Sequence, residues 1–523
     1  MAEPILVDGN WQRSHGSKTF RATNPTTNQV LATEYPVSDW SDCENVLAAA
    51  ERAFIDMQNG VSAEQLATFI ERIAQRFDNR SEEICELAFI ETGLPVQPRL
   101  AGVEMPRTTN QLRLAADAVR QHSWSRPTID TQSDIRSIHA AIGPVAIFGP
   151  NNFPLAFGSL SGGDFAAALA AGNPVIAKSN SSHPGCTKLL AEEVQFAAEE
   201  CNMPSGLVQM IYRTSHADGE KLIADERLAA VGYTGSRIAG LKLKNVADSK
   251  GKPIYLELSS INPVVILPGA IVERSDDIAN ELAGSCLLGT GQFCTSPGLI
   301  IVQDSSESQN FVATLTEKID NAANGILLSG NVQHSLIDSI AVLKNAGAEV
   351  LCGGDPSDEE GIRFKNTVMK VSADTFLKSA EVFQTEAFGN CSLIVVANDA
   401  NQMVEITKQF EGNLTGTIYA HSGDNDNPTY DLLAPVLRQK VGRLLNDKMP
   451  TGVAVSAAMN HGGPFPATGH PVFSAVGMPD TILRFSMLQC FDNVREHWLP
   501  EALQDANPLG IVRRVDGLWT KDP

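Results

Sequence analysis

An alternation of short apolar runs and amphipathic segments constrains the fold of this chain most strongly. Five apolar runs with the length of buried strands follow one another from about residue 140: "GPVAIFGP", "PVIAKSN", "GLVQMIY", "LAAVGYTGS" and "PIYLELSS". Helical patterns such as "GCTKLLAEEVQFAAEEC" and "RIAGLKLKNVA" separate these runs. Strands that alternate with helices pair in parallel and bury both faces of their sheet. The sequence therefore predicts an α/β fold built on a parallel sheet.

The flanking regions extend this prediction. Before residue 140, "SAEQLATFIERIAQRF" and "EMPRTTNQLRLAADAV" read as helices, and Ser62 and Gln65 stand at the spacing of a capping box. After residue 264, a second alternation runs through "PVVILPGA", "LIIVQ", "AEVLCGG" and "CSLIVVAND". A chain of 523 residues is too long for one hydrophobic core. We therefore expect at least two α/β domains with a cleft between them.

Composition narrows the class of partner. A net charge of -21 leaves no global basic field to attract nucleic acid or an anionic membrane. The start "MAEPILVDGNWQRSHG" lacks the pattern of a signal peptide, and no apolar run is long enough to cross a bilayer. The nine cysteines are dispersed without a C-x-x-C pair, which predicts neither disulfides nor a metal site. We expect a cytoplasmic protein with no nucleic-acid or membrane partner.

Polar side chains stand where the predicted strands end, which is where ligands of parallel sheets bind. Asn152 can donate to an oxyanion, or it can simply close a turn before Phe-Pro. Lys178 can bind a ribose or a phosphate, or it can extend into solvent. Gly235 and Gly240 bracket a strand-to-helix turn that can hold a pyrophosphate, or they are ordinary turn glycines.

Two further residues carry reactive groups. Glu257 ends the apolar run "YLELSS", where a desolvated carboxylate has a raised pKa and can act as a general base. Pairing with a neighbouring donor explains this carboxylate equally well. Cys294 in "GTGQFCTSP" follows two glycines and can be a nucleophile, although a lone cysteine is usually a buried filler. No single feature decides between these readings, so the decision rests on their joint occurrence and order.

Six segments in chain order resemble motifs of the aldehyde dehydrogenase superfamily: "GPNNFPLAFG", "AKSNSSHP", "GYTGSRIAG", "LELSSINP", "GQFCTSP" and "TEAFGN". The resemblance covers nearly the whole chain. It implies a Rossmann-type cofactor domain over 1–263, with 120–140 part of a small oligomerisation flap. It also implies an α/β catalytic domain over 264–470 and a C-terminal segment over 471–523 that returns to the cofactor domain or the flap. Such proteins form homodimers or homotetramers by strand exchange.

The resemblance implies a mechanism that assigns a role to each catalytic candidate. Cys294 attacks an aldehyde carbon, because a thiolate is a strong nucleophile and a good leaving group. The Asn152 amide and the Cys294 backbone N–H bind the oxyanion. Hydride transfer to a nicotinamide gives a thioacyl enzyme, and Glu257 activates the water that releases a carboxylic acid.

The same resemblance implies the cofactor site. Its residues are Lys178, Ser181, Arg213, Gly235, Ser236, Gly240, Glu386 and Phe388. Lys178 and Glu386 hold the two riboses, Ser236 holds the pyrophosphate, and Phe388 packs near the nicotinamide ribose.

Cofactor preference depends on one departure from the motif. Relatives that prefer NAD often carry a glutamate where this chain has Ser181, and a serine does not repel a 2′-phosphate. Arg213 or His216 adds positive charge nearby, so we predict NADP, with NAD as the alternative. Elsewhere, Ser259-Ser260 replaces a glycine pair after the base, and Asn390 replaces a proline. The serines can alter backbone freedom around Glu257, and neither departure removes a reacting group.

Within the superfamily, "EMPRTTNQLRLAADAV" and "HGGPFPATGHP" look most like the branch of 2-oxoglutarate semialdehyde (2,5-dioxopentanoate) dehydrogenases. That branch also includes an NADP-linked bacterial fatty-aldehyde dehydrogenase. Arg107 can clamp a substrate carboxylate at the aldehyde tunnel, or it can pair with Glu104 on the helix surface. An apolar tunnel wall would suit a long aldehyde equally well. The residues predicted to line the tunnel are Phe153, Phe157, Phe293 and Phe465.

Two alternatives remain open at the level of sequence. A CoA-acylating relative would lack the base, so Glu257 argues against that activity. A non-catalytic scaffold protein would not need Asn152, Glu257 and Cys294 together.

Overall fold

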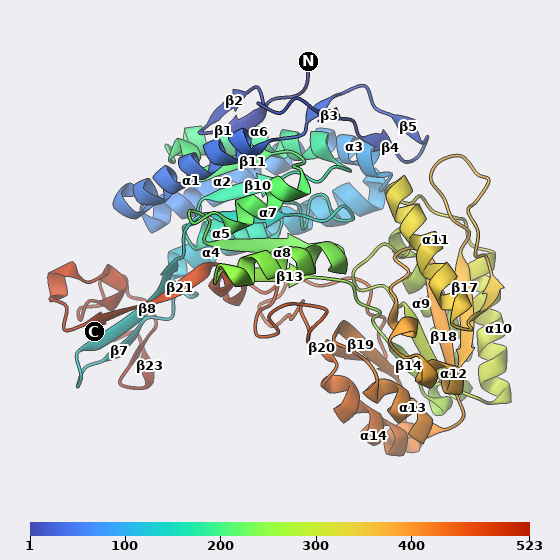
Figure 1. Ribbon diagram of the computed structural model, residues 1–523. Helices are drawn as coiled ribbons and strands as arrows, with labels where there is room; N and C mark the ends of the chain where they lie inside the picture. Colours follow the sequence, from blue (N-terminus) through green and yellow to red (C-terminus); the bar gives the residue numbers. More distant parts are fainter. Residues whose placement is uncertain (523) are drawn as a thin grey trace.

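The computed structural model describes residues 1–522 and contains two seven-stranded sheets and one five-stranded sheet (Figure 1). The first sheet has the order β13-β12-β9-β10-β11-β1-β2. Its strands are β1 (Ile5–Val7), β2 (Asn10–Gln12), β9 (Val145–Phe148), β10 (Val175–Lys178), β11 (Val208–Ile211), β12 (Ala230–Thr234) and β13 (Ile254–Glu257). From β9 the chain moves outward through β10 and β11, and then returns to add β12 and β13 on the other side. This doubly wound order confirms the predicted α/β fold.

The register aligns the ends of the parallel strands. Phe148 pairs with Lys178, and Thr234 pairs with Glu257. The polar residues that follow β9, β10, β12 and β13 therefore lie at one edge of the sheet, beside the point where the strand order reverses.

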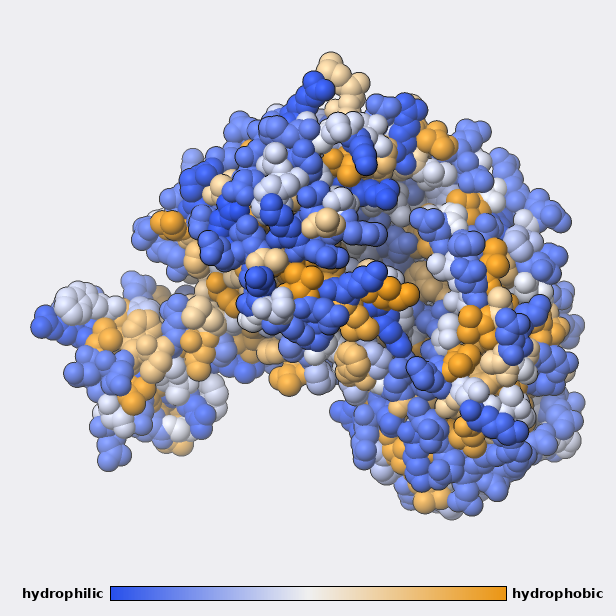
Figure 2. Space-filling model, viewed as in Figure 1, coloured by the Kyte–Doolittle hydropathy of each residue, from blue (hydrophilic) through white to orange (hydrophobic). Residues whose placement is uncertain are grey.

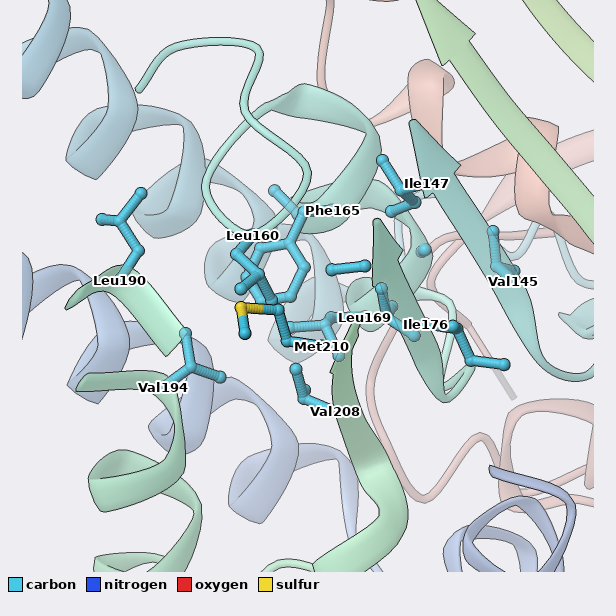
Figure 3. Packing of buried hydrophobic residues seen from close by; sticks show 14 of the residues in the cluster. Val145, Ile147, Leu160, Phe165, Leu169, Ile176, Leu190, Val194, Val208 and Met210 are labelled. Carbon is cyan, nitrogen blue, oxygen red and sulfur yellow. The ribbon is translucent and has the colours of Figure 1, made fainter. Parts of the chain in front are cut away.

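Helices cover both faces of this sheet. They are α1 (Trp40–Gly60), α2 (Ala63–Asn79), α3 (Ser81–Thr92), η1 (Val96–Glu104), α4 (Met105–Gln121), α5 (Gly163–Ala170), α6 (Pro184–Glu200), η2 (Ser205–Leu207), α7 (His216–Ala224) and α8 (Arg237–Ser249). In Figure 3, Phe165 of α5 and Leu190 of α6 lie close to the apolar strand residues, such as Ile176 and Met210. Each large side chain buried in this way stabilises the fold by about 1.5–3 kcal/mol.

The start of α2 follows the prediction only in part. Ser62 Oγ accepts a hydrogen bond from the Gln65 backbone N–H at 3.1 Å, which is one half of a capping box. The Gln65 side chain instead donates to the backbone oxygens of Cys201 and Asn202. The Gln65 side chain therefore bonds to the chain after α6, and it does not complete the capping box at the start of α2.

The second sheet has the order β16-β17-β18-β15-β14-β19-β20, with all pairs parallel except β16-β17. Its strands are β14 (Val264–Ile266), β15 (Leu299–Gln303), β16 (Glu349–Cys352), β17 (Thr367–Ser372), β18 (Cys391–Ala397), β19 (Asn413–Tyr419) and β20 (Val441–Asn446). Its helices are α9 (Pro268–Leu287), η3 (Leu288–Gly291), α10 (Ser306–Asp320), α11 (Gly330–Asn345), α12 (Ala373–Lys378), η4 (Val382–Gln384), α13 (Ala400–Lys408), η5 (Asp424–Asp426) and α14 (Asn427–Arg438). The second predicted alternation thus forms a second α/β unit.

The third sheet joins the middle of the chain to its end in the order β21-β8-β7-β22-β23. Its strands are β7 (Thr128–Asp130), β8 (Ile135–Ala141), β21 (Ser486–Asp492), β22 (Arg513–Val515) and β23 (Leu518–Thr520), and the short helices η6 (Asp480–Phe485), η7 (Glu496–Trp498) and η8 (Glu501–Leu503) flank them. This sheet projects from the rest of the molecule and carries the C-terminal strands (Figure 1). Orange hydrophobic side chains are visible on it in Figure 2.

Short strands complete the N-terminal region: β3 (Thr19–Phe20), β4 (Thr23–Asn24), β5 (Gln29–Val30) and β6 (Tyr35–Pro36). No helix within residues 1–522 is long and apolar enough to span a membrane. The domain bounds given above stay a prediction.

Candidate active site

Cys294 lies in a turn with an unusual backbone. Three successive residues, Gly289, Thr290 and Gly291, have φ of 58°, 60° and 67°. A Cβ on Gly291 would lie 2.1 Å from the backbone oxygen of Gly389, so only glycine fits there. The next residue, Gln292, anchors the turn: its Oε1 accepts from the Leu328 N–H at 2.8 Å, and its Nε2 donates to two backbone oxygens. The loop therefore presents Cys294 in a defined position.

Glu257 and His461 lie beside the thiol. Glu257 is the last residue of β13, and its Oε1 is 2.9 Å from His461 Nε2. The same nitrogen is 3.5 Å from Cys294 Sγ. Both Glu257 and His461 are buried, and Glu257 Oε2 has no hydrogen-bond partner among the described residues. The three side chains form one compact cluster from distant parts of the chain.

The two acids of this cluster have pKa values shifted in opposite directions. Burial raises the pKa of the Cys294 thiol well above its usual value, and the nearby Glu257 carboxylate raises it further. The sequence-based prediction of a raised pKa for Glu257 is wrong. Burial does push that pKa up, but the charge and hydrogen bond of His461 and the hydrogen bond with Cys294 outweigh it and lower the net value. The geometry therefore favours a neutral thiol beside an ionised carboxylate.

Asn152 lies against the turn that carries Cys294. Its side chain is 6% exposed, and its Nδ2 donates to the backbone oxygen of Gln292 at 2.9 Å. Arg99 donates to the Asn152 backbone oxygen at 2.9 Å, which fixes the loop after β9. An amide nitrogen carries two hydrogens, so one remains to bind an oxygen near Cys294.

Comparisons with known proteins agree with this arrangement. The aldehyde dehydrogenase family matches residues 11–427. The chain belongs to the aldehyde dehydrogenase family. It is 36% identical to alpha-ketoglutaric semialdehyde dehydrogenase 2 of Azospirillum brasilense, covering 95% of this chain and 96% of that one. It is 34% identical to the alpha-ketoglutaric semialdehyde dehydrogenase of Acinetobacter baylyi, covering 99% and 100%.

Solved structures of aldehyde dehydrogenases share the fold. The NAD+ complex of the Bacillus cereus enzyme superimposes with a TM-score of 0.80 at 21% identity, covering 94% of this chain and 96% of that one. An AldC mutant of Pseudomonas syringae, complexed with NAD+ and octanal, also has a TM-score of 0.80, at 20% identity and coverage of 94% and 96%. The chain is thus an NAD(P)-dependent aldehyde dehydrogenase by family and fold.

The predicted pyrophosphate turn of this aldehyde dehydrogenase precedes α8. Ser236 is the N-terminal cap residue of α8, and Tyr233 Oη donates to its backbone oxygen at 3.2 Å. A Cβ on Gly235 would lie 2.7 Å from Tyr233 Oη, and one on Gly240 would lie 2.4 Å from Leu258. Because both glycines permit close packing of helix against strand, the amino end of α8 faces the carboxyl edge of the sheet.

Lys178 is half-buried at the end of β10. Burial, and then the charge of Arg213, lower the pKa of Lys178 to about 8. Across the described residues, no carboxylate pairs with it within 4 Å. Arg213 lies two residues beyond β11, as predicted, and is exposed, whereas Ser181 lies in the loop between β10 and α6. His216 is the first residue of α7. A half-buried ammonium without a paired carboxylate fits a site whose ligand supplies the oxygens.

Glu386 lies on the other side of the base loop. It accepts from the Ser260 N–H at 3.3 Å, and burial raises its pKa. The partly buried Phe388 packs against the first hydrophobic core. Ser260, at the unusual serine pair, donates to Asn262 Oδ1 at 2.9 Å, and Asn390 donates to Asn366 Oδ1 at 2.7 Å. Both departures from the family motif are therefore held by hydrogen bonds.

Arg107 points towards the reactive cluster. Its Nη1 donates to the backbone oxygen of Val453, while its buried Nε and Nη2 have no partner within residues 1–522. Burial lowers its pKa, and the charges of the Glu104 and Glu257 carboxylates oppose that effect. The alternative of an Arg107–Glu104 surface pair is wrong, because Glu104 is buried and pairs with Arg99 at 2.8 Å.

Three of the four predicted tunnel aromatics cluster together. Phe153 packs edge-to-face on Phe157 and Phe293, with ring centroids 5.3 and 5.0 Å apart. The Phe157 ring lies 5.5 Å from the His461 ring and 5.0 Å from the Arg107 guanidinium. Phe465 does not join this cluster and is 57% exposed, so its place in the tunnel wall stays a prediction.

Sequence reasoning missed His461. The residue stands in the quoted segment "HGGPFPATGHP", but it lies 167 residues from Cys294 and 204 from Glu257. No periodicity or spacing rule connects positions so far apart.

Proposed function

We propose that this aldehyde dehydrogenase oxidises 2-oxoglutarate semialdehyde (2,5-dioxopentanoate) to 2-oxoglutarate. The single observation that carries the substrate is Arg107, whose buried Nε and Nη2 have no partner among the described residues. Its guanidinium lies 5.0 Å from the Phe157 ring, which in turn lies 5.5 Å from the His461 ring. A guanidinium can hold a carboxylate through two parallel hydrogen bonds, which places a substrate with a carboxylate at its far end. The names of the two relatives at 34% and 36% identity support the same substrate.

The catalytic roles follow from the geometry. The Cys294 sulfur lies within 4.8 Å of a Glu257 carboxylate oxygen, so we assign to this carboxylate the proton that leaves as sulfur joins the aldehyde carbon. The free Asn152 N–H and the Cys294 backbone N–H hold the oxygen that becomes negative. The bound nicotinamide supplies the acceptor for the hydride that leaves this carbon.

The second half-reaction needs Glu257 as a base again. Glu257 first releases the thiol proton to solvent, and His461 Nε2, 2.9 Å from Glu257 Oε1, holds the carboxylate in place. Glu257 then takes a proton from a water molecule, which adds to the thioester carbon. The carbon–sulfur bond then breaks, which frees the Cys294 thiolate and releases a carboxylic acid.

For the cofactor we propose NADP, with NAD as the alternative. The support is the positive charge of Arg213, which acts on Lys178, together with the neutral Ser181 three residues after Lys178. Arg213→Gln should raise KM for NADP about fivefold, the value of roughly 1 kcal/mol for an exposed ion pair, and leave KM for NAD unchanged. Equal changes in KM for NADP and NAD would show that Arg213 does not bind the 2′-phosphate.

The direct test of the substrate is steady-state kinetics with three aldehydes, each with NAD and with NADP. We expect the highest kcat/KM for 2-oxoglutarate semialdehyde, a lower value for succinic semialdehyde and the lowest for hexanal. The phenylalanine cluster favours one alternative, a medium- or long-chain fatty aldehyde, and that alternative holds if hexanal is preferred. Consumption of free CoA would instead identify an acylating enzyme, and retained cofactor binding without turnover would identify a scaffold.

We also propose a homodimer or homotetramer that forms through the projecting sheet, in the cytoplasm. Five large apolar side chains on its strands are exposed, namely Ile135, Met487, Leu488, Leu518 and Trp519. Light scattering should give a mass two or four times that of the chain, and a charged residue at Leu518 should shift it towards the monomer.

A further inference from the structure

We propose that Cys294, Glu257 and His461 form a binding site for a thiophilic divalent cation of the Zn²⁺ class, and that occupancy reversibly blocks the nucleophile. One ligand atom from each residue lies within 4.8 Å of the other two. The sequence predicted no metal site because its cysteines are dispersed. The three ligands of this cluster come from segments that are far apart in the chain. The inference depends on the cluster and not on which aldehyde the enzyme oxidises.

The distances suit a tetrahedral ion. Zinc bonds of about 2.0–2.3 Å place neighbouring ligand atoms roughly 3.3–3.6 Å apart. The Cys294 Sγ–His461 Nε2 distance is already 3.5 Å. The His461 Nε2–Glu257 Oε1 distance is 2.9 Å and must widen by only about half an ångström to meet that range. Three protein ligands leave the fourth tetrahedral position for a water molecule.

The donor set selects the type of ion. Thiolate and imidazole favour zinc-like ions over Mg²⁺ and Ca²⁺, which prefer oxygen ligands. A thiolate and a carboxylate together neutralise the two positive charges, so the buried site ends without a net charge. Glu257 Oε2, buried and without a hydrogen-bond partner, offers a second oxygen to the ion. The nearby Arg107 is the main opposing charge.

Binding exchanges a proton for the metal without any redox step. The Cys294 S–H bond breaks, an S–Zn bond forms, and the proton leaves to solvent. The sulfur lone pair is then engaged, and Glu257 and His461 are unable to move protons. Inhibition should therefore compete with aldehyde and be reversed by a chelator.

Anaerobic titration of the full-length protein with Co²⁺ tests the proposal directly. We expect a thiolate-to-cobalt charge-transfer band that saturates at one ion per chain and is displaced by Zn²⁺. Cys294→Ser should abolish the band. His461→Asn and the isosteric Glu257→Gln should each weaken binding by at least the ~10–100-fold that loss of an outer-shell partner costs. Cys490→Ser, which removes an exposed thiol outside the site, should change nothing.

Two outcomes would overturn the proposal. One is a band that survives Cys294→Ser or disappears with Cys490→Ser. The other is tight binding that neither His461→Asn nor Glu257→Gln weakens, because the ion would then be held by the thiol alone. Since the readout needs no aldehyde, failure of the proposed substrate and failure of the metal site are distinguishable.

Discussion

Replacement of Arg107 by methionine tests the substrate assignment most sharply. Methionine keeps most of the length and apolar contact of the side chain, including packing on Phe157, but removes the guanidinium. Hydrogen bonds to charged groups contribute about 1.5–3 kcal/mol. At 1.4 kcal/mol per factor of ten, kcat/KM for 2-oxoglutarate semialdehyde should fall about 10- to 150-fold, mostly through KM.

Hexanal provides the internal reference, because it has no carboxylate to bind. Its kcat/KM should stay within about twofold, the error of such estimates, since Cys294, Glu257 and Asn152 are untouched. Arg113 on the same helix offers a matched control: its side chain is exposed and pairs with Asp78, so Arg113→Met should affect neither aldehyde. The assay follows reduced cofactor formation with both aldehydes.

The reasoning is refuted if Arg107→Met lowers kcat/KM for both aldehydes to the same extent. Arg107 also donates to the backbone oxygen of Val453, so a common loss would mean that its main role is to hold that loop. A selective loss for the carboxylated aldehyde would leave the clamp as the explanation.

Three further outcomes are expected. Glu257→Gln should lower kcat about 10²- to 10⁴-fold, since this carboxylate takes a proton in both half-reactions; because the pKa of Glu257 is lowered, the wild-type rate should show no loss of this base above about pH 5, and a loss there would contradict its ionised state. Lys178, with a pKa lowered to about 8, loses its charge above that pH, so the cofactor Kd, measured by fluorescence titration, should rise there, and Lys178→Gln should remove this dependence. Gly291→Ala should lower Tm and activity together, because its Cβ would meet the Gly389 oxygen; an unchanged melting curve would show that the turn can relax.

Local patterns in the sequence determined the layers and the edge at which the site lies. Apolar runs of strand length alternate with helices, and parallel strands end at the same edge of their sheet. The sequence alone therefore predicts that Lys178 and Glu257 lie at one edge, as the strand registers show. Gly291 and Gln292 beside Cys294 likewise belong to one short segment, whose motif predicts Cys294 as the nucleophile. Periodicity reports which face of an element is apolar, and it works over a window of a few residues.

Contacts between distant segments were decided only by the tertiary structure. His461 reaches Glu257 and Cys294 across 204 and 167 residues, and that contact reversed the expected direction of the Glu257 pKa. Glu104 pairs with Arg99, so it is not the partner of Arg107. Phe465 is 57% exposed and lies apart from the other phenylalanines. The physical reason is that charge and burial act through space, and a local sequence pattern carries no information about which distant loop will fill the space beside a given side chain.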